Sequence, residues 1–367
     1  VEYIVKDSKS KVVFVGSQRQ YAVMREVIAA CPSVDLMVAM SDKIEIESVD
    51  SCTARYSVVV SRDYSQDLYN EVDFRTSSAV PDDVATLLYT SGTTGEPKGT
   101  VLPHSCFNAQ LEFHRVRLSG LSQTDSSLCF LPLSHIFEKA WTYFCLMMGI
   151  HVTVNYDPRL VADVLPRVRP TCMCAVPRCW EKVYTAVNER FAGMSAVGRK
   201  IVAAAMQVGY RRNLEYLRVG RSVPKYLALK YALYDKLVFS KVKKRIGLDN
   251  PNIFPVAGAP LSDSIVEFMR GIGIPVVVGY GLSETTATVS CFPDVNYRIG
   301  TVGTPIEDIE VKLGAENEIL VKGPTVMRCY FNKEEATREA FTEDGWFRTG
   351  DAGKIEEAAD TIESLSA

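Results

Sequence analysis

Short apolar runs alternate with segments of helical periodicity along most of this 367-residue chain. Residues 11–15 and 35–40 are strand-like, and residues 21–30 between them have helical spacing. The same alternation returns in residues 127–176 and 253–278. Strands joined through a helix pair in parallel, because the helix carries the chain back across the sheet. The sequence therefore predicts an α/β fold with doubly wound, mostly parallel sheets in two subdomains.

Two segments depart from this alternation. Residues 186–247 have helical periodicity, interrupted near residues 220–224, and are predicted to form a helical insertion. Residues 301–355 contain short, glycine-punctuated apolar runs and are predicted to form a small antiparallel, β-barrel-like unit. We therefore expect an α/β body over residues 1–300 that contains the insertion, then the small β subdomain, and a tail over residues 356–367.

The distribution of charge indicates which class of partner this protein could bind. The formal net charge is −3, so nothing overall points to nucleic acid. Residues 186–250, however, carry 14 Lys and Arg against 4 Asp and Glu. This basic segment is a candidate surface for anionic membrane lipids. A solvated helical hairpin packed on the body is the simpler alternative. Oligomeric state leaves no signal in the sequence.

The 10 cysteines are scattered, and only Cys172, Cys174 and Cys179 lie close together, with a spacing that fits no common zinc site. We expect reduced, mostly buried thiols and a cytoplasmic protein that can associate peripherally with the inner face of a membrane. No apolar run is long enough to cross a bilayer. The chain begins at Val1 with a strand-like run, so we expect the natural N-terminus to lie further upstream.

A loop rich in hydroxyl groups follows the apolar run at residues 84–89. Hydroxyls, glycine amides and one ammonium group together suit a polyphosphate. The candidate phosphate ligands are Thr90, Ser91, Gly92, Thr93, Thr94, Gly95 and Lys98. A Walker loop would need Gly-Lys-Ser/Thr at the start of a helix, but Pro97 and Gly99 flank the lysine, which argues against that class. A plain solvated turn is the other alternative.

The stretch at residues 89–99, YTSGTTGEPKG, resembles the signature of the adenylate-forming superfamily, which includes acyl-CoA synthetases, firefly-luciferase-like enzymes and nonribosomal peptide adenylation domains. Further stretches resemble other motifs of that superfamily in the same order. The resemblance implies the large N-terminal body of an enzyme that attaches AMP to a carboxylate, and it covers almost the whole chain.

The resemblance also implies roles for single residues. Residues 256–260, VAGAP, resemble the loop on the adenine side, with Gly258, Ala259 and Pro260 against the base. In residues 279–285, GYGLSET, the implied ligands are Tyr280 for adenine, Gly281 beside it, Ser283 for the α-phosphate and Glu284 for Mg²⁺. Thr90 would be the other protein group near the metal.

Two more motifs complete the implied site. In residues 345–351, GWFRTGD, Asp351 would accept hydrogen bonds from the ribose hydroxyls. In residues 131–139, LPLSHIFEK, His135 would lie beside the fatty-acid carboxylate. The implied catalytic residues are thus Lys98, His135 and Glu284.

Residues 169–184 and the helical insertion resemble long-chain fatty acyl-CoA synthetases. This implies a long-chain fatty acid–CoA ligase that uses ATP and Mg²⁺ and transfers the acyl group to CoA. An enzyme that delivers acyl groups to a carrier protein and a non-catalytic nucleotide-binding fragment are the alternatives. The superfamily's hinge and its mobile, lysine-bearing C-terminal domain are not recognised after residue 355, so we expect the mobile domain to be absent from this stretch.

Overall fold

The computed structural model describes residues 1–90, 96–356 and, for the backbone, 361–364. The chain divides into two compact units. The first consists of Val1–His104 and Arg328–Glu335, and the second of Ser105–Met327 and Ala336–Ala367. Each unit is described by itself.

A three-stranded parallel sheet begins the first unit, as the β-α-β pattern predicts. Its strands lie in the order β1 (Val12–Val15), β2 (Leu36–Ala39) and β3 (Thr53–Arg55). Helix α2 (Gln18–Val27) and the turn η1 (Ile28–Ala30) connect the first two strands. The buried side chains include Val15, Tyr21, Met24 and Met37. The expected strand at the chain start is wrong. Residues Glu2–Ser8 form helix α1, which buries Val5 and ends at Lys9 in a left-handed conformation.

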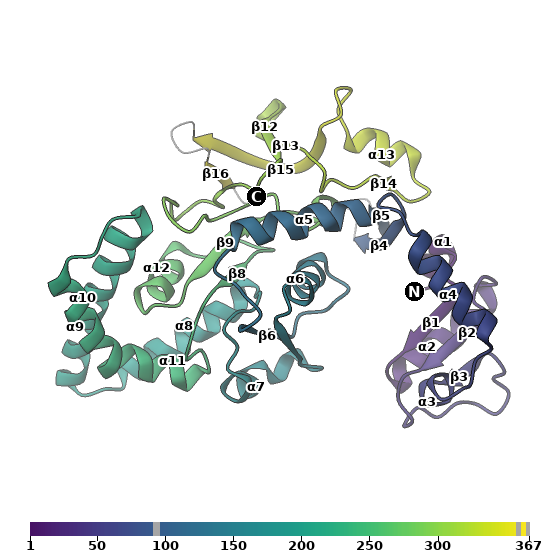
Figure 1. Cartoon of the computed structure of the whole chain (residues 1–367), viewed down its shortest axis with the longest axis horizontal. Helices are drawn as coiled ribbons and strands as arrows, with labels where there is room; N and C mark the ends of the chain where they lie inside the picture. The colour runs from purple at the N-terminus through teal and green to yellow at the C-terminus, as the bar shows by residue number, and fades with distance from the viewer. Residues whose placement is uncertain (91–95, 357–360, 365–367) are drawn as a thin grey trace. The chain divides into compact units, whose positions relative to one another are not determined.

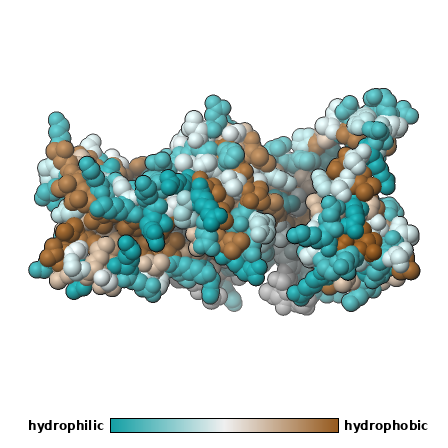
Figure 2. Space-filling view, turned by 90° about the horizontal axis from the view of Figure 1, so that it is seen from below, coloured by the Kyte–Doolittle hydropathy of each residue, from teal (hydrophilic) through white to brown (hydrophobic). Residues whose placement is uncertain are grey.

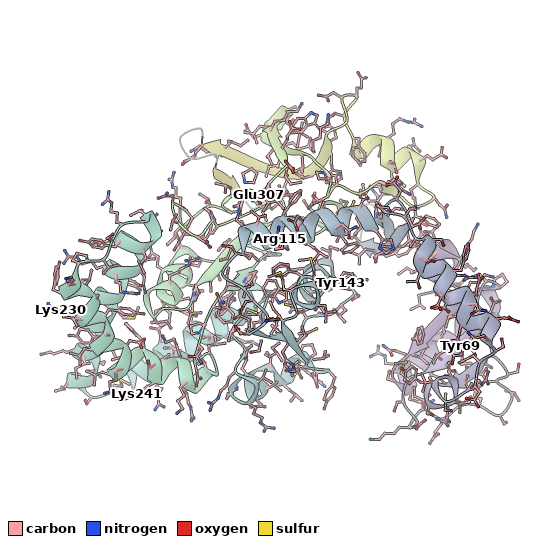
Figure 3. All side chains as sticks on the ribbon, viewed as in Figure 1. Tyr69, Arg115, Tyr143, Lys230, Lys241 and Glu307 are labelled. Atoms are coloured by element: carbon pink, nitrogen blue, oxygen red, sulfur yellow. The ribbon has the colours of Figure 1, made fainter. Side chains whose placement is uncertain are left out.

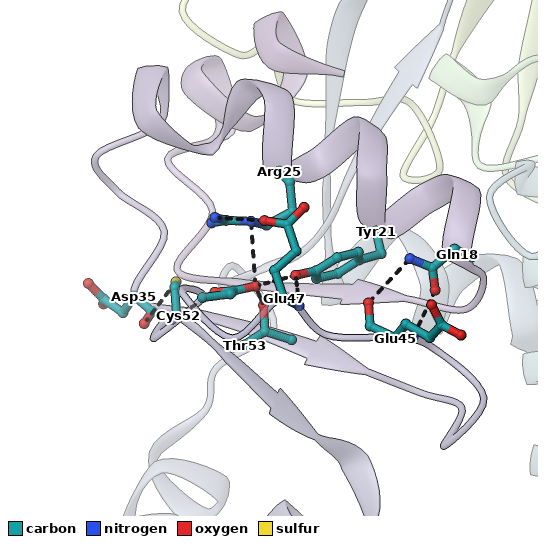
Figure 4. A network of polar contacts seen from close by, with 9 residues as sticks. Gln18, Tyr21, Arg25, Asp35, Glu45, Glu47, Cys52 and Thr53 are labelled. Carbon is teal, nitrogen blue, oxygen red and sulfur yellow. Dashed lines mark hydrogen bonds and ion pairs between the residues drawn. The ribbon is translucent and has the colours of Figure 1, made fainter.

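A polar network joins α2 to the loops beside this sheet (Figure 4). The Tyr21 hydroxyl donates to Asp50 at 2.8 Å and accepts from the Glu47 amide at 3.0 Å. Thr53 also donates to Asp50, at 2.6 Å, and the Arg25 guanidinium lies 3.6 Å from the same carboxylate. The network satisfies a buried carboxylate, which would otherwise be costly to remove from water.

Two short helices and a second sheet complete the first unit. The helices are α3 (Tyr56–Val60) and α4 (Gln66–Ser78). Strands β4 (Val84–Thr90) and β5 (Lys98–Pro103) pair antiparallel, and β14 (Cys329–Tyr330) pairs with the other edge of β5.

The second unit contains the doubly wound sheet. Strand β6 (Ser126–Cys129) pairs in parallel with β7 (His151–Val154), and β8 (Phe254–Val256) pairs in parallel with β9 (Val276–Tyr280). Residues 171–176, predicted as a strand, form single bridges that join Ser127 to Ile253 through Cys172. The short strands β10 (Ser290–Cys291) and β11 (Thr304–Pro305) continue the sheet in antiparallel fashion beyond β9.

Helices accompany the strands of this sheet, as expected of a doubly wound fold. They are α5 (His104–Arg117, whose first residue belongs to the other unit), α6 (Ile136–Met147), α7 (Val161–Val168), α8 (Pro177–Ala192) and α12 (Asp263–Gly271). The buried side of α8 carries Trp180, whose ring centre lies 5.5 Å from that of Phe254 on β8. The burial of large aromatic side chains of this kind is the main source of cohesion in a core.

Asp125 ties three segments together at the amino end of β6. Its carboxylate accepts hydrogen bonds from Thr171 at 2.7 Å, from Asn252 at 3.0 Å and from the Ser122 amide at 2.9 Å. Burial alone would raise the pKa of Asp125, but these hydrogen bonds outweigh it and hold that pKa below its ordinary value. The ionised carboxylate therefore holds β6, residues 171–172 and the start of β8 in register.

The segment predicted as a helical insertion is helical, and its break falls where the sequence places it. Figure 1 shows its helices gathered at one end of the second unit, away from β12 and β13. Gly220 follows the first part in a left-handed conformation, and Gly247 ends the last helix in the same way. The elements after α8 are α9 (Ala196–Tyr210), η3 (Arg211–Tyr216), η4 (Leu217–Val219), α10 (Lys225–Tyr234), η5 (Asp235–Phe239) and α11 (Ser240–Ile246).

The C-terminal strands of the second unit form an antiparallel sheet, as predicted. The strand order is β12 (Glu310–Leu313), β13 (Glu318–Lys322), β15 (Phe347–Glu356) and β16 (Thr361–Ser364). Within the described residues this sheet is open, so the expected barrel-like closure is not found. Helix α13 (Glu334–Ala340) precedes β15, and no described helix is both long and apolar enough to span a membrane.

A buried histidine on α5 generates a prediction about stability. His114 Nε2 lies 3.0 Å from the Gln110 amide and 3.1 Å from the Thr288 hydroxyl. Burial, with a smaller contribution from Arg117, lowers the pKa of His114 to about 4. The unfolded chain takes up this proton near pH 6.5, so the unfolded state binds more protons between pH 6.5 and 4. Stability must fall as the pH falls through that window.

We expect His114→Gln to remove this part of the pH dependence. Relative to the parent protein, its free energy of unfolding should rise by up to about 3 kcal/mol between pH 7 and pH 4. All three tryptophans, Trp141, Trp180 and Trp346, lie in the second unit. Urea unfolding followed by tryptophan fluorescence therefore reports on the second unit, which also contains His114. Equal pH slopes for the two proteins would contradict the prediction.

Candidate nucleotide site

The predicted phosphate loop belongs to the first unit. Thr90, the last residue of β4, lies opposite Lys98, the first residue of β5. The two ends of the loop are thus paired at the base of a hairpin. The middle of the loop lies outside the described residues: Ser91, Gly92, Thr93, Thr94 and Gly95. Lys98 begins a strand, whereas a Walker loop would place it at the start of a helix, so the argument against that class is confirmed.

An aromatic ring and a small residue define the surroundings of Lys98. Its Nζ atom lies 5.0 Å from the centre of the Tyr330 ring, a cation–π distance. A Cβ atom at Gly99 would lie only 3.0 Å from the Tyr89 ring, so the residue after the lysine must be small. Tyr89 in turn donates to Asp7 at 2.6 Å, and burial, strengthened by that carboxylate, raises the pKa of Tyr89. The hairpin is therefore fixed close to the position of the lysine.

The motifs predicted for the adenine side belong to the second unit. Val256 at the end of β8 pairs with Val278 of β9, so the loops after these parallel strands leave the sheet at the same edge. Gly258, Ala259 and Pro260 follow β8 and are exposed. Gly258 has a φ of +89°, and apart from its two chain neighbours no described residue has an atom within 4 Å of the place where a Cβ would stand. A planar base could approach such a surface closely.

The ring predicted for adenine and the acid predicted for ribose are in contact. The Tyr280 hydroxyl donates to Asp351 Oδ2 at 2.7 Å. Burial, and to a smaller extent the Asp351 carboxylate, raises the pKa of Tyr280, so the phenol remains a donor. The Asp351 amide donates to Thr349 Oγ1 at 3.1 Å, and that hydroxyl donates to the Ile319 carbonyl at 2.8 Å. These hydrogen bonds hold β15 in the orientation that brings Asp351 into contact with Tyr280 at the end of β9.

A tight turn follows Tyr280. A Cβ atom at Gly281 would lie 1.8 Å from the Ala287 carbonyl oxygen, so glycine alone fits there. Thr286 and Ala287 adopt left-handed conformations, with φ of +52° and +85°. Non-glycine residues in this region are uncommon and cluster at functional sites, where the surrounding structure maintains the strain.

The same turn fixes the backbone of Glu284. Its carbonyl accepts a hydrogen bond from the Met327 amide at 2.7 Å. Two residues on, Thr286 donates to the Thr325 carbonyl at 2.6 Å. Ser283 and Glu284 are half-buried in this hydrogen-bonded turn. A carboxylate and a hydroxyl on a rigid turn are suited to bind a hard cation and a phosphate oxygen.

The predicted acyl-side histidine lies on a loop that a buried acid holds. His135 is exposed and directly precedes α6. Glu138, fully buried on the first turn of that helix, accepts hydrogen bonds from the Leu131 amide at 2.9 Å and from Thr142 at 3.3 Å. Burial raises the pKa of Glu138. The acid therefore anchors the loop that presents His135.

A small apolar cavity of about 30 Å³ lies beside Tyr280. Phe137, Ala140 and Trp141 of α6 line it together with Tyr280 and His114. The structure thus brings α6, which follows the predicted acyl-side histidine, next to Tyr280, the tyrosine predicted for adenine, although His135 itself is not among the lining residues.

Three residues of this region had no role in the sequence analysis. They are Glu138, Thr349 and His114. A signal for Glu138 was present, because it lies three and seven residues before Trp141 and Cys145, on the buried face of a helix. Thr349 and His114 form hydrogen bonds with residues far away in the sequence, and a local sequence pattern does not reveal such contacts. Within the described residues, no three His, Cys, Asp or Glu side chains are grouped to hold a metal ion, and all 10 cysteines are free thiols.

Comparison with curated proteins identifies relatives. A model of the family described as AMP-binding enzyme matches residues 1–331. The putative fatty-acid–CoA ligase fadD11 of Mycobacterium tuberculosis is 36% identical over 280 residues, which cover 75% of this chain and 48% of that protein. The long-chain-fatty-acid–CoA ligase FadD15 of Mycobacterium bovis is 31% identical over 360 residues, covering 97% and 57%. The chain spans about half the length of these relatives.

Solved structures share the fold. The N-terminal domain of FACL13 from Mycobacterium tuberculosis matches with a TM-score of 0.64 at 21% identity, covering 100% of this chain and 76% of that one. The o-succinylbenzoate coenzyme A synthetase of Bacillus subtilis, in complex with ATP and magnesium ion, matches with a TM-score of 0.62 at 19% identity, covering 100% and 61%. With most of its length matched by the family model and relatives above 30% identity, the chain belongs to the AMP-binding enzyme family.

Proposed function

We propose that this chain is the nucleotide-binding part of a long-chain fatty acid–CoA ligase, which activates a fatty acid with ATP and transfers it to CoA. The observation that carries the proposal is the contact between Tyr280 and Asp351, at the sheet edge from which the exposed loop at Gly258 also leaves. This is the carboxyl edge of the parallel strands β8 and β9, and α/β sheets bind their ligands at such an edge. Family membership and the names of the two curated relatives support the proposal.

The second unit would bind the nucleoside and part of the phosphates. The Tyr280 ring would stack on adenine, with the backbone of Gly258, Ala259 and Pro260 on the base as well. Asp351 would accept hydrogen bonds from the ribose hydroxyls. Ser283 would donate to the α-phosphate, and Glu284 would supply a hard oxygen ligand to Mg²⁺. The strained turn at Gly281 supports the roles of Ser283 and Glu284, because it holds the backbone of these two residues rigidly.

The first unit would bind the remaining phosphate oxygens. The Lys98 ammonium group would neutralise their charge, and the loop between Thr90 and Lys98 would supply hydroxyls and amides. Thr90 is the second candidate to hold Mg²⁺, since its hydroxyl group is an oxygen ligand of the kind that this ion prefers. When bound, the ion would reduce the repulsion between ATP and an anionic substrate.

The reaction consists of two displacements. A carboxylate oxygen of the fatty acid attacks the α-phosphorus of ATP, the bond to the β-phosphate oxygen breaks, and acyl-adenylate and pyrophosphate result. The sulfur of CoA then attacks the acyl carbonyl, its proton is released, and AMP leaves. Because both first reactants are anions, the protein contributes mainly charge neutralisation and positioning. His135 would position the carboxylate, which ionises without a base.

The surface of the helical segment supports peripheral contact with an anionic membrane, where long-chain fatty acids reside. Tyr226, Leu229 and Leu233 lie on one face of α10 and are 51%, 73% and 56% exposed. Lys230 of α10 and Lys241 of α11 are exposed and point outward (Figure 3). An exposed apolar stripe among lysines is typical of helices that lie in a lipid interface.

Pyrophosphate release tests the proposed reaction. With ATP and Mg²⁺, we expect palmitate to support faster release than acetate, and no release when the acid is omitted. Formation of the thioester should depend on CoA. Faster release with acetate would contradict the substrate class. Acyl transfer to a carrier protein without CoA would favour the carrier-dependent alternative, and no release with any acid would favour the non-catalytic one.

Glu284→Gln tests the metal-binding role. The substitution keeps the size of the side chain but removes its charge, so Mg²⁺-dependent release of pyrophosphate should fall about 100-fold or more. Glu343→Gln, an exposed acid of the same unit, is the matched control and should leave the rate unchanged. Turnover retained in the Glu284 variant would refute the assignment.

Co-sedimentation with liposomes tests the membrane contact. We expect binding to vesicles that contain phosphatidylglycerol at low salt, weakened by high salt. The double change Lys230→Glu and Lys236→Glu should weaken binding at least about tenfold, because each basic residue near an anionic surface contributes about 1 kcal/mol. The control, Lys43→Glu with Arg62→Glu, alters exposed positions of the other unit. Equal binding to neutral and anionic vesicles would contradict the proposal.

A further inference from the structure

A cavity in the helical segment of the second unit shares no lining residue with the nucleotide-site motifs. Its volume is about 570 Å³, and α8, α9, η5 and α11 enclose it. The cavity beside Tyr280 measures about 30 Å³, and the two cavities share no lining residue. A volume of this size lies within the range of about 300–1,000 Å³ typical of small-molecule sites. The helical segment therefore contains a candidate site of its own.

Most of the residues that line this cavity are apolar. Val187, Phe191 and Val202 are buried at its floor. Ile201 and Leu237 also line it, yet they are 42% and 45% exposed. Figure 2, which views the molecule from below, shows hydrophobic surface over this end of the second unit, bordered by hydrophilic side chains. The apolar lining is thus continuous with the surface, so an apolar chain could enter from outside.

The charged residues that line the cavity are all positive. Arg190, Lys241 and Arg245 line the cavity, and no described lining residue is acidic. All three cations are exposed, and none forms an ion pair with a described residue. Three cations beside an apolar cavity complement a ligand that has a long apolar part and one anionic end.

We propose that this cavity binds one long-chain carboxylate, a free fatty acid, at a site separate from the adenylation site. The acyl chain lies between α8 and α11, and the carboxylate lies at the mouth near Arg190 and Lys241. One chain is favoured over a bilayer surface, because the lining residues surround a cavity of about 570 Å³ and do not form a flat face. Binding at this site requires no ATP, so it does not depend on the proposed ligase reaction.

The test uses the fluorescent fatty acid cis-parinaric acid, titrated into the protein without ATP. We expect saturable binding that dodecanoate displaces, whereas dodecanol, which lacks the charge, and acetate, which lacks the chain, displace it at least about tenfold less well. If dodecanol displaces the probe as well as dodecanoate does, the cations have no part in binding and the proposal is wrong.

Two pairs of variants locate the site. Ala186→Trp places a large side chain at a lining position, and Lys241→Glu reverses one of the three charges. Each should weaken binding about tenfold, the effect of losing one charge-assisted contact or part of the cavity. The matched controls are Ala203→Trp on α9 and Lys244→Glu on α11, two exposed positions that do not line the cavity. Their affinities should stay within about twofold of the parent.

Three outcomes overturn the proposal. Equal affinity of the parent, Ala186→Trp and Lys241→Glu places the fatty acid elsewhere. Competition of the probe with ATP would place it at the adenylation site. Loss of binding to phosphatidylglycerol vesicles in Lys241→Glu, with unchanged cis-parinaric acid affinity, would assign the charges to a membrane surface. The ligase proposal is judged separately by pyrophosphate release, which Ala203→Trp and Lys244→Glu should leave unchanged.

Discussion

Parallel pairing of β8 with β9 is the constraint on which the candidate site depends. Because Val256 lies opposite Val278, the loops that begin at Ala257 and Gly281 must leave the same edge of the sheet. The core below this edge holds the register, with Trp180 packed against Phe254 and Asp125 joining β6 to the start of β8. A slip of one residue would turn the Tyr280 ring to the other face of the sheet.

Polar side chains and left-handed residues gather at this edge, while most of the core below it is apolar. The left-handed residues Thr286 and Ala287 persist because neighbouring backbone and side chains hold them, as the hydrogen bond from Thr286 to Thr325 shows. Such a turn presents Glu284 without a loss of conformational freedom on binding, which suits a reaction that depends on positioning. Glu138 similarly fixes the predicted acyl side, because its buried carboxyl group anchors the loop that contains His135.

Local pattern predicted most of the fold. The parallel strands, the break near Gly220 and the antiparallel strands after β11 all have a clear period or turn signal in the sequence. Residues 2–8 were mistaken for a strand because the segment is short and half-buried, so periodicity could not separate the two states. The roles of Tyr280 and Asp351 came from resemblance alone. Their hydrogen bond joins β9 to a strand of another sheet, and no pattern within either strand encodes it.

A structure of the chain with bound AMP tests the central claim most directly. The account predicts that adenine lies on the Tyr280 ring beside Gly258, and that the ribose hydroxyls donate to Asp351. An Asp351→Asn variant, which keeps the shape of the side chain but removes its charge, should then bind AMP about tenfold more weakly, while adenine binding changes little. If AMP binds away from β8 and β9, or if Asp351→Asn binds it as the parent does, the assignment of this edge as the nucleotide site is wrong.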